Sequence, residues 1–431
     1  MRAIKTEIAV VGAGIVGLSA ALSLAQAGLK VLHIRQAEPA PTPPAPDRPF
    51  DRRVYAIAPA SRALLESMSV WQSLPPDRVA PVYDMRVFPA THQEAQELHL
   101  SAYEAGCEAL AWIAESEALI AVLEQALSFA RVKSHIGTVV SLDPDAGQHY
   151  STLTLADGQT VQAGLVVAAD GAGSPLRGLA GIAQSRKPYN QKALVAPLAL
   201  GLPHRDGAWQ WFGDHGVLAV LPLPRHASLA GSHLPALDPD TGGHRASLVW
   251  STHTEFAEHM LAQPPAALGE ALTALTGRRL GEIQVLEPAV GFDLRLCRSA
   301  SLIANRLVLV GDAAHVIHPL AGQGLNVGLA DVAVLARTLS QARSHYRKAS
   351  FDAGSPLLLR RYQRYRAEPI AAMQQITDLL SRAFDPGQQL LPSLGELPRA
   401  PFEALRDAGW ALASQNRFLR KQFVRYATQQ F

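Results

Sequence analysis

The chain has 431 residues, enough for two or three domains with a deep cleft between them. Its 39 basic and 37 acidic residues give a net charge of +2, without the concentrated basic stripe of a nucleic-acid-binding protein. The two cysteines, Cys107 and Cys297, are too few for a disulfide framework and lack metal-ligand spacing, which favours a cytoplasmic protein without a metal site.

Residues 8–29 form an uncharged run of 22 residues that hydropathy alone would take for a membrane span. Glycines divide this run into a strand at residues 7–11, a turn, and a helix at residues 15–27 that stops at Gly28. A second strand follows at residues 30–34. The glycine positions therefore favour a strand–helix–strand unit, the start of a parallel sheet, over a membrane span.

The middle of the chain alternates between loops, helices and strands. The six prolines of residues 37–51 predict a surface loop, and helices are expected at residues 59–68 and 115–130. Residues 81–100 alternate like an antiparallel strand. A hairpin with an Asp157–Gly158 turn leads into a buried strand at residues 165–169.

The second half begins with antiparallel patterns and ends in helices. Residues 187–287, with strands at 216–223 and 246–251, predict a separate, mainly antiparallel layer. Residues 224–245 show little pattern and predict a loop. From residue 327 onward the chain is expected to be mostly helical.

Three glycine-rich motifs each follow an apolar strand. In the first, Gly12 permits a tight turn, Gly14 lets a pyrophosphate approach the backbone, and Gly17 allows close packing of strand and helix. Arg35 stands where an acid usually binds the ribose. Three explanations stay open: Glu38 substitutes for the acid, the adenosine is held loosely, or the arginine binds the 2′-phosphate of NADP.

The second and third motifs are "LVVAADGAGSPLR", which contains Asp170, and "LVLVGDAAHVIHPLAGQGLN", which contains Asp312. Because one nucleotide fingerprint suffices for NADP, three motifs favour a larger cofactor with two ends. Together they resemble the flavin-dependent aromatic hydroxylase class with the p-hydroxybenzoate hydroxylase fold. The resemblance implies that Asp312 binds a ribityl hydroxyl group of FAD.

The same resemblance implies roles for other residues. The helix start that contains Gly322, Gly324, Leu325 and Asn326 would direct backbone N–H groups at the flavin pyrimidine. Asp170 would lie near the FAD pyrophosphate, although an aspartate before glycine is also common as a turn or helix cap.

Arg53 matches the class's arginine near the flavin, with a solvated side chain as the alternative. Pro319 would line the flavin pocket, and His315 and His318 are the nearest candidates for a base that activates a phenol. A structural hydrogen-bonding role for either histidine is the alternative, and no third ligand supports a metal site.

Within the class, the chain most resembles the ubiquinone-biosynthesis hydroxylases, with "HPLAGQGLN" as the most specific match. The implied reaction is hydroxylation of the phenolic ring of a polyprenylated ubiquinone precursor, through a flavin C4a-hydroperoxide formed with NAD(P)H and O₂. A flavin-class reductase and a non-catalytic FAD-binding subunit of a biosynthetic complex are the alternatives.

The resemblance also implies the fold class and the domains. We expect an α/β protein with a Rossmann-like FAD-binding domain of the glutathione-reductase type, an inserted antiparallel substrate domain and a helical C-terminus. The predicted FAD-binding domain comprises residues 1–80, 101–186 and 288–345, the substrate domain residues 81–100 and 187–287, and the C-terminal region residues 346–431.

Partners follow from the implied substrate, because a polyprenylated phenol resides in a bilayer. The chain would then contact the inner membrane peripherally or receive its substrate within a biosynthetic complex, and a homodimer also stays open. Residues 416–431 form a basic, amphipathic pattern that suits anionic lipid, with a helix packed on the protein as the alternative.

Overall fold

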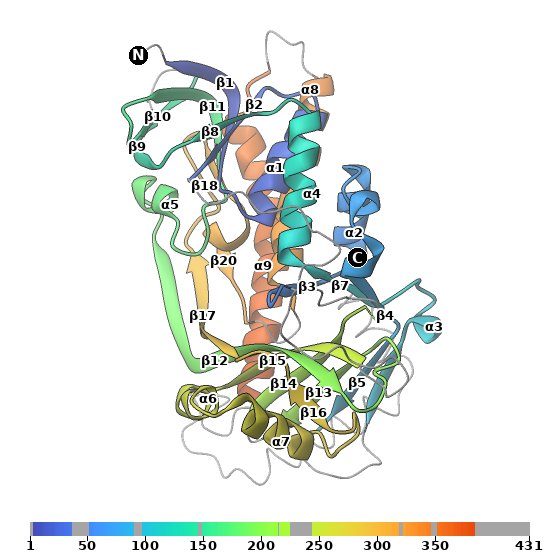
Figure 1. The fold of residues 1–431 in the computed structure, drawn as a ribbon. Helices are drawn as coiled ribbons and strands as arrows, with labels where there is room; N and C mark the ends of the chain where they lie inside the picture. Colours follow the sequence, from blue (N-terminus) through green and yellow to red (C-terminus); the bar gives the residue numbers. More distant parts are fainter. Residues whose placement is uncertain are drawn as a thin grey trace.

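The computed structural model describes residues 3–36, 51–89, 97–144, 149–213, 215–224, 244–318, 322–345 and 351–383, with side chains described up to residue 378. The loop predicted at residues 37–51 and the one at 224–245 thus lie almost wholly outside the described residues, as do Glu38, Pro319 and the basic segment 416–431. Figure 1 shows two large sheets at opposite ends of the molecule, with the long strand β12 (Gln184–Leu200) running from the second sheet toward the first.

The first sheet has a parallel centre, in which β19, β11, β1, β2 and β8 are neighbours in that order. Three antiparallel strands, β18, β10 and β9, extend it. The strands are β1 (Ile4–Val11), β2 (Val31–Arg35), β8 (Lys133–Ile136), β9 (Val139–Asp143), β10 (Ser151–Leu155), β11 (Thr160–Ala168), β18 (Ile303–Ala304) and β19 (Leu307–Leu309). The predicted strand–helix–strand unit is confirmed, with ends shifted by at most three residues. The predicted hairpin into β11 is also confirmed, and β11 begins five residues earlier than predicted.

Helices α1 (Ile15–Gln26), α4 (Ser116–Phe129) and α8 (Gly324–His345) pack beside this sheet, and α8 also contacts α9 (Pro356–Ala383) (Figure 1). Helix α1 is apolar on nearly every side, which suits its position between α4 and α8. The helix predicted at residues 59–68 is α2 (Pro59–Ser67), which contacts α8. Short helices are α3 (Ala102–Ala105), α5 (Pro175–Leu179), η1 (Trp71–Ser73), η2 (Pro76–Arg78) and η4 (Gly311–Ala313).

The second sheet is antiparallel except where β5 pairs with β13. Its strands are β5 (Asp84–Phe88), β6 (Leu98–Ser101), β12, β13 (Gly207–Gly213), β14 (Gly216–Pro222), β15 (His244–His253), β16 (Ile283–Val285), β17 (Val290–Ser299) and β20 (His315–Val316). Helices α6 (Thr254–Leu261) and α7 (Pro265–Leu275) cover one face of this sheet, where leucines of β12, β14 and β15 form a second core. The expectation of an antiparallel layer and the predicted fold class are confirmed.

A third, small sheet consists of β3 (Val54–Ile57), β7 (Ala111–Glu115) and β4 (Val79–Val82). It corrects the interpretation of residues 81–100 as one strand, because β4 pairs with β7 whereas β5 and β6 join the second sheet. Alternation predicts strands but not the sheet to which each strand belongs. The predicted domain boundaries stay a prediction; β17 and β20, which belong to the second sheet, lie outside the ranges given for the substrate domain.

Candidate active site

The first glycine motif is packed tightly at two of its glycines and open at the third. A Cβ atom on Gly12, whose φ is +137°, would lie 2.1 Å from the Ala169 carbonyl oxygen, and one on Gly17 would lie 2.3 Å from the Gly12 oxygen. A Cβ on Gly14 would meet no atom within 4 Å. Gly12 and Gly17 thus allow the close contacts of strand and helix, while Gly14 leaves the start of α1 open to a ligand.

The second motif lies against the first, since Ala169 directly precedes Asp170. The Oδ2 atom of Asp170 accepts the Leu176 backbone N–H at 3.0 Å, which caps helix α5. Its Oδ1 atom is buried and has no hydrogen-bond partner within the described residues, and burial raises the pKa of its carboxyl group. The helix-cap alternative therefore explains one oxygen of Asp170, and the other is left for a ligand or water.

Arg177 connects the second motif to the third. Its buried guanidinium group donates to the Ala313 carbonyl oxygen at 2.8 Å, to the Ala172 carbonyl oxygen at 3.1 Å and to the Gln184 side chain at 3.0 Å. These bonds hold the end of β11 next to the turn that contains Asp312. The residue thus positions the two motifs relative to each other.

The third motif meets the first at Val16. A Cβ atom on Gly311 would lie 3.1 Å from a methyl group of Val16, and one on Gly328 would lie 2.8 Å from the other. Only residues without side chains at these two positions let the turn and helix α8 approach α1 this closely. The start of α1, the Asp312 turn and the first turns of α8 therefore converge on one place in the molecule.

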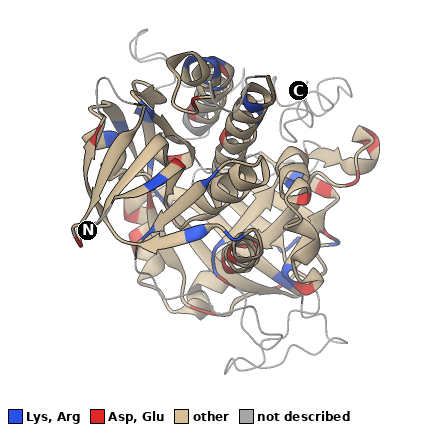
Figure 2. Cartoon of the chain, turned by 90° about the horizontal axis from the view of Figure 1, so that it is seen from above, with Lys and Arg blue, Asp and Glu red and all other residues tan. Residues whose placement is uncertain are grey.

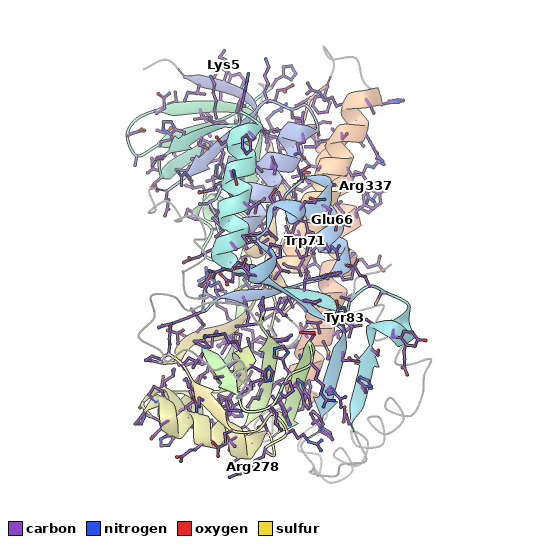
Figure 3. All side chains as sticks on the ribbon, turned by 45° about the vertical axis from the view of Figure 1, so that its right-hand side comes forward. Lys5, Glu66, Trp71, Tyr83, Arg278 and Arg337 are labelled. Carbon is purple, nitrogen blue, oxygen red and sulfur yellow. The ribbon has the colours of Figure 1, made fainter. Side chains whose placement is uncertain are left out.

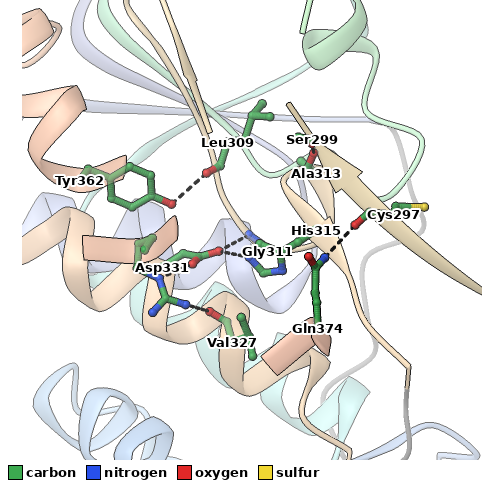
Figure 4. Close-up of polar contacts among 11 residues, drawn as sticks. Cys297, Ser299, Leu309, Gly311, Ala313, His315, Val327, Asp331, Tyr362 and Gln374 are labelled. Carbon is green, nitrogen blue, oxygen red and sulfur yellow. Dashed lines mark hydrogen bonds and ion pairs between the residues drawn. The ribbon is translucent and has the colours of Figure 1, made fainter. Parts of the chain in front are cut away.

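A buried network behind this turn holds it in place (Figure 4). The carboxylate of Asp331, on α8, accepts hydrogen bonds from the Gly311 backbone N–H at 2.9 Å, from His315 at 2.7 Å and from Arg366 at 2.6 Å. Arg366 also donates to the Val327 carbonyl oxygen at 3.0 Å. Complete burial of Asp331 acts to raise the pKa of its carboxyl group, but the interactions with His315 and Arg366 outweigh this effect and lower the pKa.

Sequence reasoning did not single out Asp331 or Arg366. An aspartate within the apolar stretch "GLADVAVLA" was the available signal, because a charge on a buried helix face requires a partner. Its partner Arg366 lies 35 residues away on another helix, so the pair could not be found from spacing.

The two candidate histidines are both buried and hydrogen-bonded to protein groups. His315 bonds to Asp331, and the Nε2 atom of His318 lies 2.8 Å from the Gln191 side-chain oxygen. His318 also packs edge-on against Tyr189, and burial lowers its pKa to about 4. These contacts support the structural alternative for both residues. A direct role of His315 in activating a phenol stays a prediction, as does the role of Pro319.

Asp312 is exposed to solvent although it belongs to the buried turn. The surrounding protein still raises the pKa of its carboxyl group, and the charges of His315, Arg295 and Arg53 act in the opposite direction. The Asp312 carboxylate is thus accessible to a ligand although protein groups lie around it. Arg53, more than 250 residues away in the chain, is close enough to affect the pKa of Asp312, and its position near the flavin stays a prediction.

The start of α8 also has open space around its backbone. Gly322 has a φ of +62°, and a Cβ on Gly324 would meet no described atom within 4 Å. The buried Asn326 side chain accepts the Ala58 backbone N–H at 2.9 Å and donates to the Ala56 carbonyl oxygen at 2.8 Å. Its side chain therefore fastens α8 to β3 and α2. Cofactor contacts at Gly322, Gly324, Leu325 and Asn326 would come from backbone N–H groups.

Arg35 lies at the end of β2, where the ribose-binding acid was expected. Its guanidinium group forms an ion pair with Glu124 of α4 at 3.2 Å, and both side chains are partly exposed. The neighbouring His33 instead bonds through Nε2 to the Gly12 carbonyl oxygen at 2.9 Å. Direct binding of a nucleotide by Arg35 stays a prediction that competes with this ion pair.

The described residues fit FAD at both of its ends. Open backbone at Gly14 suits the pyrophosphate, the unpaired oxygen of Asp170 suits a hydroxyl group or a water as donor, and the accessible carboxylate of Asp312 suits a ribityl hydroxyl group. Open backbone at Gly324 suits the polar edge of the ring.

Comparison with known proteins agrees with this geometry. A family model described as "FAD binding domain" matches residues 5–376. Ubiquinone hydroxylase UbiL of Rhodospirillum rubrum is 33% identical, covering 88% of this chain and 81% of that protein. The 3-demethoxyubiquinol 3-hydroxylase of Escherichia coli K12 is 32% identical, covering 98% of both chains. The chain belongs to the ubiquinone-biosynthesis hydroxylase family.

Members of this family are FAD-dependent monooxygenases, and this chain is therefore an FAD-dependent aromatic-ring monooxygenase. Solved structures of lower identity share its fold. The p-nitrophenol 4-monooxygenase PnpA from Pseudomonas putida has a TM-score of 0.71 at 17% identity, covering 98% of this chain and 97% of that one. PqsL from P. aeruginosa, in complex with 2-aminobenzoylacetate, has a TM-score of 0.70 at 19% identity, covering 90% of this chain and 99% of that one.

Proposed function

We propose that this hydroxylase adds oxygen to the phenolic ring of a polyprenylated ubiquinone precursor, with NAD(P)H as the electron donor. The observation that carries the proposal is the convergence of three motifs at one place, in a chain that aligns along 98% of its length with a 3-demethoxyubiquinol 3-hydroxylase. FAD supplies the redox and oxygen chemistry when it is bound.

The residues of the chain then act by binding, orientation and exclusion of water. Asp312 accepts a hydrogen bond from a ribityl hydroxyl group, the backbone N–H groups at Gly14 hold the pyrophosphate, and Asp170 lies beside it. The N-terminus of α8 places its partial positive charge against the polar edge of the ring. Arg53 adds a positive charge near Asp312.

The test begins with purified protein loaded with FAD. We expect a 2-alkylphenol to accelerate oxidation of NADH or NADPH severalfold, and expect one atom of isotopically labelled O₂ to appear in the product. A reductase would oxidise the nicotinamide without labelling the product. A non-catalytic flavin-binding subunit would bind FAD but show no response to any phenol.

We further propose that the protein contacts the membrane peripherally. No helix in the described part of the chain is long and apolar enough to span a bilayer. Four arginines, Arg337, Arg360, Arg361 and Arg364, are exposed on α8 and α9 and form no ion pair within the described residues. In Figure 3, Arg337 points away from the body of the protein.

An exposed aromatic side chain lies among these arginines. Arg337 and Arg361 each lie within 6 Å of the Tyr365 ring centre, at 5.9 and 5.7 Å. The side chain of Leu357, also on α9, is 68% exposed. Cations beside exposed apolar groups suit the headgroup region of an anionic bilayer, where the proposed substrate would reside. A biosynthetic complex and a homodimer stay as predictions.

A further inference from the structure

The two faces of the second sheet differ in what covers them. One face packs on α6 and α7, and its side chains, among them Leu194, Leu198, Val220 and Leu248, are completely buried. Residues in the same strands that point to the opposite face, Val195, Pro197, Leu221 and Val249, are only partly buried. This opposite face is therefore apolar and still partly accessible.

The partly accessible face looks toward the flavin-binding side of the molecule. Leu221 and Leu223 pack with Val82, Ile113 and other residues of the small sheet β3–β7–β4. Strand β3 in turn contacts the start of α8, since a Cβ on Gly322 would lie 3.3 Å from the Ala56 methyl group. An apolar ring bound on this face would lie between the second sheet and the open helix start.

Arg245 is a charged residue on this otherwise apolar face. Its neighbour Ala246 belongs to the core under α6 and α7, so the Arg245 side chain points the other way. The backbone N–H of Leu223 bonds to the Arg245 carbonyl oxygen at 3.1 Å, which places these residues opposite each other on adjacent strands, with their side chains on the same face.

The Arg245 side chain is 8% exposed and has no hydrogen-bond or ion-pair partner within the described residues. Burial alone lowers its pKa, and no carboxylate counteracts this effect. Ser247, two residues along the same face and 3% exposed, has no side-chain hydrogen bond there either. A guanidinium group that is mostly buried and has no partner within the described residues is poorly solvated, which makes a bound oxygen its expected partner.

We propose that Arg245 and Ser247 form a subsite that binds the phenolic oxygen of the substrate ring and favours its ionised form. This proposal rests on the proposed function, because it specifies how that substrate would be held. The guanidinium group forms a charge-assisted hydrogen bond to the oxygen, and the released proton passes to solvent. An ionised oxygen makes the ring richer in electrons, which is what addition of oxygen to the ring requires.

The test compares wild type with Arg245→Met in the FAD-loaded protein. Met keeps most of the side-chain volume but removes the charge. We expect the variant to bind a 2-alkylphenol at least tenfold more weakly than wild type, while binding of the matching 2-alkylanisole, which cannot ionise, is unchanged. Arg279→Met removes an equal charge from an exposed position and serves as the control, with no change for either ligand.

A second readout follows the charge of a bound ligand directly. With 4-nitrophenol, the visible absorption of the phenolate should show a larger ionised fraction on wild type than on Arg245→Met at the same pH. Because Arg245 has no partner in the fold, the Met variant should melt at or above the wild-type temperature. An unfolded Met variant, or equal losses for phenol and anisole, would overturn the subsite.

The outcomes also separate this proposal from the proposed function. If wild type hydroxylates the 2-alkylphenol and Arg245→Met discriminates between phenol and anisole as wild type does, only the subsite is wrong. If wild type binds FAD but never labels a phenol with oxygen, the proposed function itself is wrong.

Discussion

Glycines at different positions of the first glycine motif have different roles. Gly14 borders open space, whereas Gly17 touches the backbone of Gly12. We expect Gly14→Ala to leave the melting temperature of the apoprotein unchanged but to weaken FAD binding, because the new methyl group occupies the approach of the pyrophosphate.

Gly17→Ala provides the contrast, since its Cβ would lie 2.3 Å from a carbonyl oxygen. We expect it to destabilise the apoprotein by about 1–3 kcal/mol, measured by chemical denaturation. Equal effects of the two variants on the stability of the apoprotein would contradict the separate roles given to these glycines.

Asp312 tests the placement of the ribityl chain. Replacement by Ala removes a charge-assisted hydrogen bond, which corresponds to FAD binding weaker by about 10- to 100-fold. Titration of the apoprotein with FAD, followed by quenching of flavin fluorescence, measures the change. Asp312→Asn keeps an oxygen acceptor and should therefore lose less affinity for FAD than the Ala variant. Unchanged affinity in the Ala variant would rule out the assigned contact.

His318 links stability to pH. Its folded pKa of about 4 lies below the unfolded value of 6.5, so between these values the unfolded chain binds a proton that the folded chain does not. The contribution of this residue is therefore complete above pH 6.5 and is lost as the pH falls toward 4. It amounts to about 3 kcal/mol.

Chemical denaturation of wild type and His318→Gln at pH 7.5 and pH 5 isolates this contribution, because other titrating groups act equally in both proteins. We expect wild type to lose more stability than the variant on going to pH 5. An identical loss in both proteins would show that His318 is not held in its neutral form.

Among the helices, α8 carries one buried charge, that of Asp331, which connects it to neighbouring elements. The Asp331 carboxylate accepts hydrogen bonds from Gly311 of the Asp312 turn, from His315 of β20 and from Arg366 of α9. Asp331→Asn leaves Arg366 with only a neutral partner, and we expect a loss of about 3–5 kcal/mol in the free energy of unfolding.

Denaturation of the apoprotein measures this loss, and FAD titration should show weaker binding because the turn is no longer held. The control is Asp293→Asn, which removes an exposed partner of Lys192 and should hardly change the melting temperature. If Asp331→Asn is as stable as wild type, the network does not support the turn.

The whole molecule carries its charges in a mixed pattern. Figure 2 shows Lys and Arg interspersed with Asp and Glu along the ribbon, in a chain whose net charge is +2. The four arginines of α8 and α9 that form no ion pair within the described residues depart from this balance. We expect Arg360→Glu combined with Arg364→Glu to abolish most binding to vesicles with anionic phospholipid.

Sedimentation with such vesicles at low and high salt measures this binding, and FAD content serves as the control, because both residues lie outside the flavin site. Salt should weaken wild-type binding, since it screens exposed charges. Binding that does not change in the double variant would place the membrane contact elsewhere.

The sequence by itself determined the three strand–turn–helix motifs, because each depends on neighbouring residues: an apolar strand, glycines in the turn, and helical periodicity. It also determined the fold class and the family. Residues 81–100 were misread as one strand because an alternating pattern does not specify the partner strand.

Only the tertiary structure decided how the motifs meet and which side chains hold them together. The Asn326 bonds to Ala56 and Ala58, and the Asp331 pair with Arg366, join residues that are far apart in the chain. The same holds for Arg245, since a lack of partners becomes visible only when all neighbours are in place. Such contacts depend on packing between elements, which local sequence patterns do not encode.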